Sequence, residues 1–228
     1  MSSRGGAGKR VEWIEAGGAN CYLIGVTGGW VLVDTGFARK RREVVEALGA
    51  AGCRSGDLRL IVITHADSDH VGNAAFLRDR LGAPIAMHAD EAGTAADGDM
   101  MATRGGLHPA KKAVAGVVMP LFRLRKDDRF EPDLLLSEGD RLDGYGLAAR
   151  VLHLAGHSRG SLALLTDDRL LFCGDVLENR RGPRPATLVD DPADLAAAVE
   201  RLRGLEVELV YPGHGAPFRM GELEALTP

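Results

Sequence analysis

A cluster of acidic residues and histidines directly after an apolar segment constrains this chain more than any other stretch. Residues 60–63, Leu-Ile-Val-Ile, read as a buried strand, and apolar residues at helical spacing follow from 71 to 81. The turn between them contains four side chains that can bind a metal: His65, Asp67, Asp69 and His70. Imidazoles and carboxylates this close together suit zinc, iron or manganese.

The same turn has a purely structural interpretation. Asp69 would then cap the helix, and His65 would pack in the core. That interpretation does not explain why two histidines and two aspartates share one turn, so metal binding is the better hypothesis.

Further histidines and aspartates follow this turn in a characteristic order. They occur in Gly156-His157-Ser158, in Gly174-Asp175 and in Pro212-Gly213-His214-Gly215, and an earlier turn is Val33-Asp34-Thr35-Gly36. Together with the His-x-Asp-x-Asp-His cluster, the series resembles the metallo-β-lactamase superfamily over about residues 11–218. The motif is most similar to the glyoxalase II-like branch, without its C-terminal helical domain. The family usually has His-x-His-x-Asp-His, so Asp67 replaces a histidine.

The resemblance implies a fold and a set of metal ligands. The fold would be an α/β, four-layer αββα sandwich of two mixed β-sheets flanked by helices. Two metal positions would be held by His65, Asp67 and His157, and by Asp69, His70 and His214, with Asp175 as the bridge. Two cations about 3.5–4 Å apart can share a hydroxide that acts as the nucleophile at neutral pH. Asp69 would orient this hydroxide and is therefore the predicted catalytic residue.

The carboxylate of Asp67 changes the expected metal preference. It is a harder ligand than imidazole and favours iron or manganese relative to an all-histidine site. The expected cofactors are two divalent metal ions, in the first place zinc, with iron or manganese as alternatives because of Asp67. With a carboxylate at this position, the motif also resembles the His-x-Glu-x-Asp motif of the flavodiiron proteins. Those proteins share the fold and perform redox chemistry.

Composition limits the class of protein. The chain has 228 residues, a normal length for one large α/β domain, and its 45% hydrophobic and 26% charged residues are ordinary values for a globular protein. The net charge of −4 gives no electrostatic reason to expect a nucleic-acid partner. No run is apolar for long enough to cross a bilayer, and residues 1–10 lack the apolar segment of a signal peptide. We therefore expect a cytoplasmic protein with a small-molecule substrate and no membrane partner.

The three cysteines also lead us to expect a cytoplasmic protein. Cys21, Cys53 and Cys173 lie far apart without a paired spacing, which is typical of buried free thiols in a reducing environment.

Periodicity divides the chain into strands and helices. We expect a disordered tail over 1–9 and a single domain over 10–228. The strands are expected at 11–15, 21–26, 30–33, 59–63, 84–87, 134–136, 147–154, 161–165, 169–173 and 207–210, and the helices at 39–51, 71–81 and 192–202. Every predicted ligand then falls at the end of a strand or in the turn after it.

Three other polar residues lie near these motifs. Asp34 either supports the metal site from behind or is a simple turn residue, two roles that look alike in sequence. His88 and His153 lie outside the motif and are predicted to be structural residues rather than ligands.

Residues 89–132 have weak periodicity and are predicted to be a helical insert that covers the substrate. Its apolar side chains would line the substrate pocket, pack on the sheet edge or form a homodimer contact; they include Met100, Met101, Met119, Leu121 and Phe122. The basic cluster Arg123, Arg125 and Lys126 would meet an anionic substrate or form a solvated face.

The leading functional hypothesis is a metal-dependent hydrolase. It would use a metal-bound hydroxide to cleave an ester, thioester, lactone or phosphoester of a small molecule. One alternative, motivated by Asp67, is an iron-dependent oxidoreductase with a flavodiiron-like site. The other is a non-catalytic metal-binding module, against which the nearly complete ligand set argues.

Overall fold

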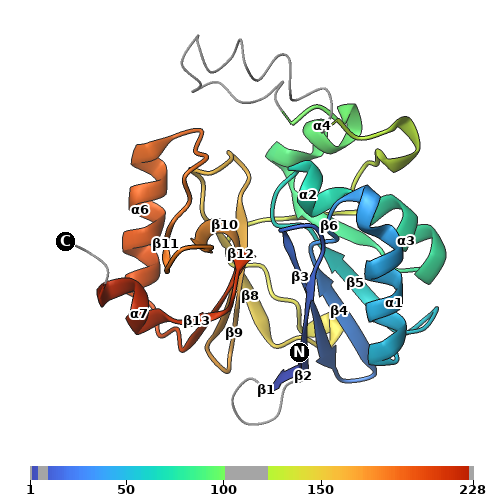
Figure 1. The fold of residues 1–228 in the computed structure, drawn as a ribbon, viewed down its shortest axis with the longest axis horizontal. Helices are drawn as coiled ribbons and strands as arrows, with labels where there is room; N and C mark the ends of the chain where they lie inside the picture. Colours follow the sequence, from blue (N-terminus) through green and yellow to red (C-terminus); the bar gives the residue numbers. More distant parts are fainter. Residues whose placement is uncertain (1, 5–9, 101–122, 226–228) are drawn as a thin grey trace.

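Two β-sheets lie face to face between two layers of helices in this computed structural model (Figure 1). The structure describes residues 2–4, 10–100 and 123–225. Helices α1 and α3 cover one sheet and α6 covers the other (Figure 1). The predicted αββα sandwich is confirmed.

The first sheet is mixed, and its seven strands follow the order of the chain. Neighbouring strands are antiparallel from β1 to β4 and parallel from β4 to β7. The strands are β1 (Ser2–Arg4), β2 (Arg10–Glu15), β3 (Asn20–Val26), β4 (Gly29–Val33), β5 (Leu58–Val62), β6 (Ile85–His88) and β7 (Leu134–Leu136). The helices of this half are η2 (Ala38–Lys40), α1 (Arg41–Ala51), α2 (Ser68–Val71), α3 (Ala74–Leu81), α4 (Ala89–Asp97) and η4 (Lys126–Asp128).

The second sheet has six strands, in the order β13-β12-β10-β9-β8 with β11 paired to β10. Strands β10 and β12 run parallel, and the other pairs are antiparallel. The strands are β8 (Ala149–His153), β9 (Leu162–Thr166), β10 (Leu170–Asn179), β11 (Arg184–Pro185), β12 (Leu209–Gly215) and β13 (Phe218–Arg219). The helices are η5 (Asp143–Tyr145), α6 (Pro192–Arg203) and α7 (Met220–Ala225).

Three apolar layers hold the sandwich together, and they explain why residues 60–63, at the end of β5 and just after it, are all apolar. Leu60 and Val62 are buried between the two sheets, whereas Ile61 and Ile63 are buried against the helices of the first half. Because both faces of the strand are covered, polar residues do not alternate with apolar ones. The third layer lies between the second sheet and α6 and contains the predicted inner residues of that helix: Leu195, Val199 and Leu202.

The helix predicted at 71–81 is divided into α2 and α3. Asn73 lies at the break, and its side-chain amide donates to the carbonyl oxygens of Thr35 (2.7 Å) and Phe37 (2.9 Å). This contact ties the break to the loop after β4. The short α2 contains Asp69 and His70, so the division decides where these two side chains lie.

Two strands of the second sheet extend beyond their predicted ends. Strand β10 continues past Cys173 to Asn179, and β12 continues to Gly215. Asp175 and His214 therefore lie inside strands, not in the turns predicted after them. The pairing of β10 with β12 has irregular register on both sides of Gly174, and Gly174 and Asp175 interrupt the apolar pattern there.

Two predicted segments lie only partly within the described residues. Ser2–Arg4 pair with β2, in place of the tail expected there, and residues 5–9 lie outside the described residues. Of the insert predicted over 89–132, the structure describes α4 and η4; residues 101–122 lie outside, including Met101, Met119, Leu121 and Phe122. Within the described ranges, no helix has both the length and the apolarity needed to span a membrane.

The three cysteines are buried free thiols, as predicted. Burial raises the pKa of Cys53 to about 11 and that of Cys173 to about 12. Both thiols therefore stay protonated near neutral pH.

Candidate metal centre

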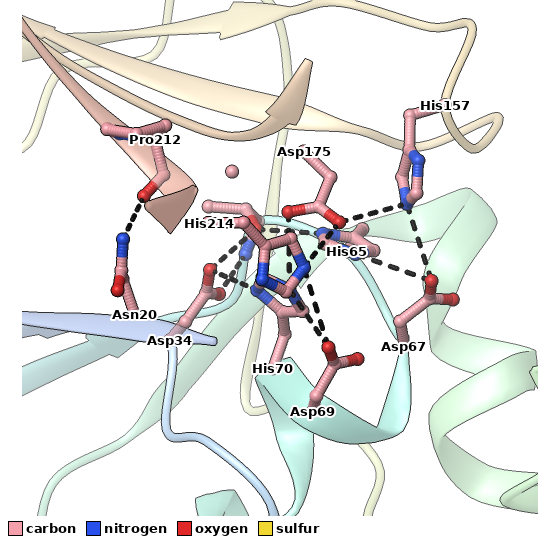
Figure 2. Close-up of polar contacts among 12 residues, drawn as sticks. Asn20, Asp34, His65, Asp67, Asp69, His70, His157, Asp175, Pro212 and His214 are labelled. Carbon is pink, nitrogen blue, oxygen red and sulfur yellow. Dashed lines mark hydrogen bonds and ion pairs between the residues drawn. The ribbon is translucent and has the colours of Figure 1, made fainter. Parts of the chain in front are cut away.

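The seven predicted ligands converge where loops and strands of both sheets meet (Figure 2). Four come from the loop after β5 and from α2, one from the loop after β8, and one each from β10 and β12. The alternative role of Asp69 as a helix cap is wrong, because Asp67 occupies the N-cap position of α2 and Asp69 lies inside the helix. The side chain of Asp67 makes no capping hydrogen bond and points toward the imidazoles (Figure 2).

His65, Asp67 and His157 form what we call the first group. The Oδ2 atom of Asp67 lies 3.4 Å from Nε2 of His157 and 3.7 Å from Nε2 of His65. All three side chains are buried. Two ring nitrogens and a carboxylate oxygen therefore face one another at distances compatible with ligands of one cation.

Asp69, His70 and His214 form the second group. Their donor atoms lie within 4.8 Å of one another. The Oδ2 atom of Asp69 is 3.5 Å from Nε2 of His214 and 3.9 Å from Nε2 of His70. The second group thus has the same kinds of donor as the first.

Asp175 lies between the two groups. Its Oδ1 is 3.3 Å from Nε2 of His70, and its Oδ2 is 3.0 Å from Nε2 of His214. The same Oδ2 is 3.9 Å from Nε2 of His157 in the first group. One carboxylate therefore contacts both groups, which is the position expected of a bridge.

Backbone carbonyls orient two of the imidazoles. Nδ1 of His157 donates to the carbonyl oxygen of Leu188 (2.7 Å), and Nδ1 of His214 donates to that of Gly18 (2.6 Å). Because a carbonyl only accepts, each Nδ1 must hold a proton, and in the neutral ring that a metal binds, Nε2 presents a lone pair to the centre.

Asp34 supports the centre from behind. Its Oδ2 is 2.8 Å from Nδ1 of His70 and also accepts from the hydroxyl of Thr64, while Oδ1 accepts the Thr64 backbone N–H. Asp34 is buried and has a positive φ of 57°. Of the two roles left open by the sequence, support of the site is therefore the one that the geometry favours. The Thr64 hydroxyl also lies 3.0 Å from Nδ1 of His65.

Several buried polar atoms at the centre lie near charged neighbours but make no hydrogen bond. Among the residues that the structure describes, Nε2 of His65, Nε2 of His70 and Oδ1 of Asp175 are buried and make no hydrogen bond. Each unsatisfied buried group costs about 1–3 kcal/mol. Imidazole nitrogens and carboxylate oxygens are donors that divalent cations accept, so these residues fit metal ions.

Protonation at the centre reflects its excess of carboxylates. Burial lowers the pKa of His70, but Asp175, Asp34 and Asp69 outweigh it and raise that pKa well above its usual value. Burial likewise raises the pKa of Asp175, but His70 and the other imidazoles outweigh it and hold that pKa well below its usual range. Without metal, a proton on His70 therefore balances part of the negative charge that a cation would otherwise balance.

The His214 turn is anchored across the two sheets. Asn20 on β3 donates from its amide to the carbonyl oxygens of Pro212 (2.9 Å, Figure 2) and Gly215 (2.7 Å). Gly213 is required here, because a Cβ at this position would lie 2.1 Å from Oδ1 of Asp175. The sequence motif around His214 includes this glycine, whereas nothing in the sequence indicates that an isolated asparagine anchors the turn.

Glu91 joins the two loops that hold the first group. It is buried on α4; its Oε2 accepts the N–H of Ala66 (2.8 Å) and its Oε1 accepts the N–H of Gly160 (2.9 Å). Ala66 lies between two predicted ligands, and Gly160 follows a third. Sequence reasoning missed Glu91 because a glutamate on a helix usually faces solvent.

A cavity of about 210 Å³ opens onto the centre. Asp69 faces it with 20% of its side chain exposed. Apolar side chains form part of the wall: Phe37, Met100, Ala186 and Leu188. Met100 therefore lines the cavity, which is one of the three roles that the sequence left open for the apolar residues of the insert.

A third group of potential donors consists of His88, Asp90 and His153. The two imidazole rings stack with centroids 4.2 Å apart. Nδ1 of His88 accepts the Asp90 N–H at the start of α4, and Nε2 of His153 lies 2.8 Å from the carbonyl oxygen of Arg159. These contacts favour the structural role predicted for both histidines.

A family comparison decides the classification of this chain. The model of the metallo-beta-lactamase superfamily matches residues 14–214. The chain belongs to this superfamily. Membership, together with the groups of histidine and aspartate side chains, supports a metal-binding hydrolase.

Individual relatives extend over most of the chain. Human acyl-coenzyme A thioesterase MBLAC2 is 32% identical and the match covers 92% of this chain and 80% of the relative. The probable metallo-hydrolase YflN of Bacillus subtilis (strain 168) is 26% identical, with coverage of 95% and 89%. Among solved structures, TTHA1623 in a di-iron-bound form has a TM-score of 0.70 and 30% identity, over 92% of this chain and 93% of that one.

Proposed function

We propose that this protein hydrolyses the thioester bond of an acyl-coenzyme A. The similarity to acyl-coenzyme A thioesterase MBLAC2, over 92% of the chain, is the observation that supports this substrate class. The apolar wall of the cavity beside the metal centre agrees with it, because an acyl chain needs an apolar surface next to the reacting carbonyl.

In this proposal the first group holds one divalent cation, the second group holds another, and Asp175 contacts both. The cations would polarise the thioester carbonyl and lower the pKa of a water molecule toward ~7. Zinc fits these donors, and the carboxylate of Asp67 makes iron or manganese alternatives.

The protein side chains would perform the remaining tasks. Asp69 reaches the cavity and would orient the attacking water and accept its proton. The water oxygen would form a bond to the thioester carbonyl carbon as the carbon–sulfur bond breaks. The leaving thiolate would then take up the proton that Asp69 had accepted. Phe37, Met100 and Leu188 would hold the acyl chain and exclude bulk water.

The test is thiol release from acyl-coenzyme A by protein that has been stripped of metal and reloaded with zinc, iron or manganese in turn. We expect release that depends on metal and that Asp69→Asn abolishes, with slower turnover of oxygen esters, lactones and phosphodiesters. Equal thiol release with and without metal would contradict the proposal.

An iron-dependent oxidoreductase is the second candidate. Asp67 and the similarity to the di-iron-bound form of TTHA1623 favour it. Iron in the purified protein, an optical band that responds to reductant and no thiol release would replace the hydrolase with this function.

A further inference from the structure

A second cavity adjoins the one at the metal centre. It has a volume of about 250 Å³ and shares Phe37 and Ser68 with the first cavity. Its lining includes four arginines, from η2, the start of α1 and the segment before η4: Arg39, Arg41, Arg123 and Arg125. Arg123 and Arg125 belong to the basic cluster for which the sequence left an anionic ligand open.

The four arginines differ in their partners. Arg41 forms an ion pair with Asp128, and Arg123 forms one with Asp99. Arg39 and Arg125 are exposed and have no carboxylate partner among the residues that the structure describes. The guanidinium of Arg39 lies 4.0 Å above the ring of Phe37, a stacking that leaves its N–H edges available.

The two cavities have opposite charge. Four carboxylates and one arginine line the first cavity: Asp67, Asp69, Asp175, Glu178 and Arg180. In the second cavity, Asp128 is the carboxylate beside the four arginines. An anionic part of a substrate is therefore attracted to the second cavity and repelled from the first, unless metal ions occupy the centre.

We propose that the second cavity binds phosphate groups of the coenzyme A portion of the substrate, with Arg39 and Arg125 as ligands. This inference rests on the proposed thioesterase function. The acyl thioester and the phosphates of coenzyme A lie at opposite ends of a long neutral arm, and the wall shared by the cavities, Phe37 and Ser68, is where the arm passes. Arginine suits this role because its planar guanidinium binds phosphate through two parallel hydrogen bonds.

The first experiment compares two thioesters of the same acyl group, one on coenzyme A and one on N-acetylcysteamine, which has no phosphate. The kcat/KM for the coenzyme A thioester is divided by that for the N-acetylcysteamine thioester. This ratio is measured for the metal-loaded protein and for the variants R39E and R125E. We expect each charge reversal to lower this ratio by about tenfold to a hundredfold, mainly through KM for the coenzyme A thioester. R150E is the matched control, an exposed arginine on β8 that lines neither cavity, and it should leave the ratio unchanged.

A binding experiment separates this inference from the proposed function. Adenosine 3′,5′-bisphosphate, which has phosphates but no thioester, is titrated into the protein by calorimetry. Binding that R39E and R125E weaken supports the phosphate site, even if no thioester is hydrolysed. Absence of binding, binding that neither reversal changes, or an unchanged substrate ratio overturns it.

Discussion

The two groups of side chains in the metal centre contain the same kinds of donor but rest on different supports. Each has two imidazoles and one carboxylate. In the first group, neutral oxygens face Nδ1 of His65 and His157. In the second group, the carboxylate of Asp34 faces Nδ1 of His70. A carboxylate behind an imidazole makes the ring a stronger ligand.

Asp175 adds to this difference. It lies 3.3 Å and 3.0 Å from the imidazoles of the second group but 3.9 Å from His157 of the first. We therefore expect the second group to bind its cation more tightly and to fill first. Equal donor sets do not imply equal sites, because the supporting charges differ.

Removal of the shared carboxylate should have the largest effect. Asp175→Ala takes a ligand from both groups, so we expect activity to fall by more than the roughly 100-fold that loss of a supporting residue costs. The measurements are kcat/KM and metal content. A variant that keeps two metal ions and most of its activity would show that Asp175 is not the bridge.

Asp34→Ala should weaken the second group more than the first. Asp34 contacts His70 directly but reaches His65 only through the Thr64 hydroxyl, so metal binding in the second group should weaken about 10–100-fold and that in the first group by less. Competition with a chromophoric chelator resolves the two affinities. Asp34→Asn keeps a hydrogen-bond acceptor without the charge and should lie in between; equal weakening of both groups would contradict the account.

Glu91→Gln tests the support of the first group. One end of the amide is a donor, so either the Ala66 or the Gly160 N–H loses its acceptor in the buried site. We expect the metal-free protein to lose about 1–3 kcal/mol in free energy of unfolding, measured with urea. Glu46→Gln on the exposed face of α1 is the control and should change stability little.

Asp67→His should have the smallest effect and sharpen the comparison most. The first group would then consist of imidazoles alone, whereas the second keeps a carboxylate. The metal preference of the first group should therefore shift from iron or manganese toward zinc. The readout is the ratio of zinc to iron bound from an equimolar mixture. An unchanged ratio would mean that Asp67 does not bind the metal.

The local part of the centre was predictable from sequence. His65, Asp67, Asp69 and His70 share one turn after an apolar strand, so their proximity follows from chain connectivity. His157, Asp175 and His214 lie far away in the chain, and only the family resemblance grouped them with the turn. The structure brings all seven together.

The supporting contacts were not predictable in the same way. Asn20 and Glu91 make hydrogen bonds to backbone groups that are remote in the chain, and a single polar residue gives no sign of such a partner. The role of Asp34 was ambiguous because turn and supporting aspartates look alike. The ends of β10 and β12 were missed because polar ligands and glycines interrupt the apolar pattern there.

Metal content tests the central claim most directly. Protein purified without chelator is titrated with zinc, iron or manganese, and the bound metal is counted by plasma emission. Two groups of equal donors but unequal support predict about two ions per chain, taken up in two steps. One ion per chain at saturation would contradict the two-group assignment, and no bound metal after supplementation would contradict the metal centre itself.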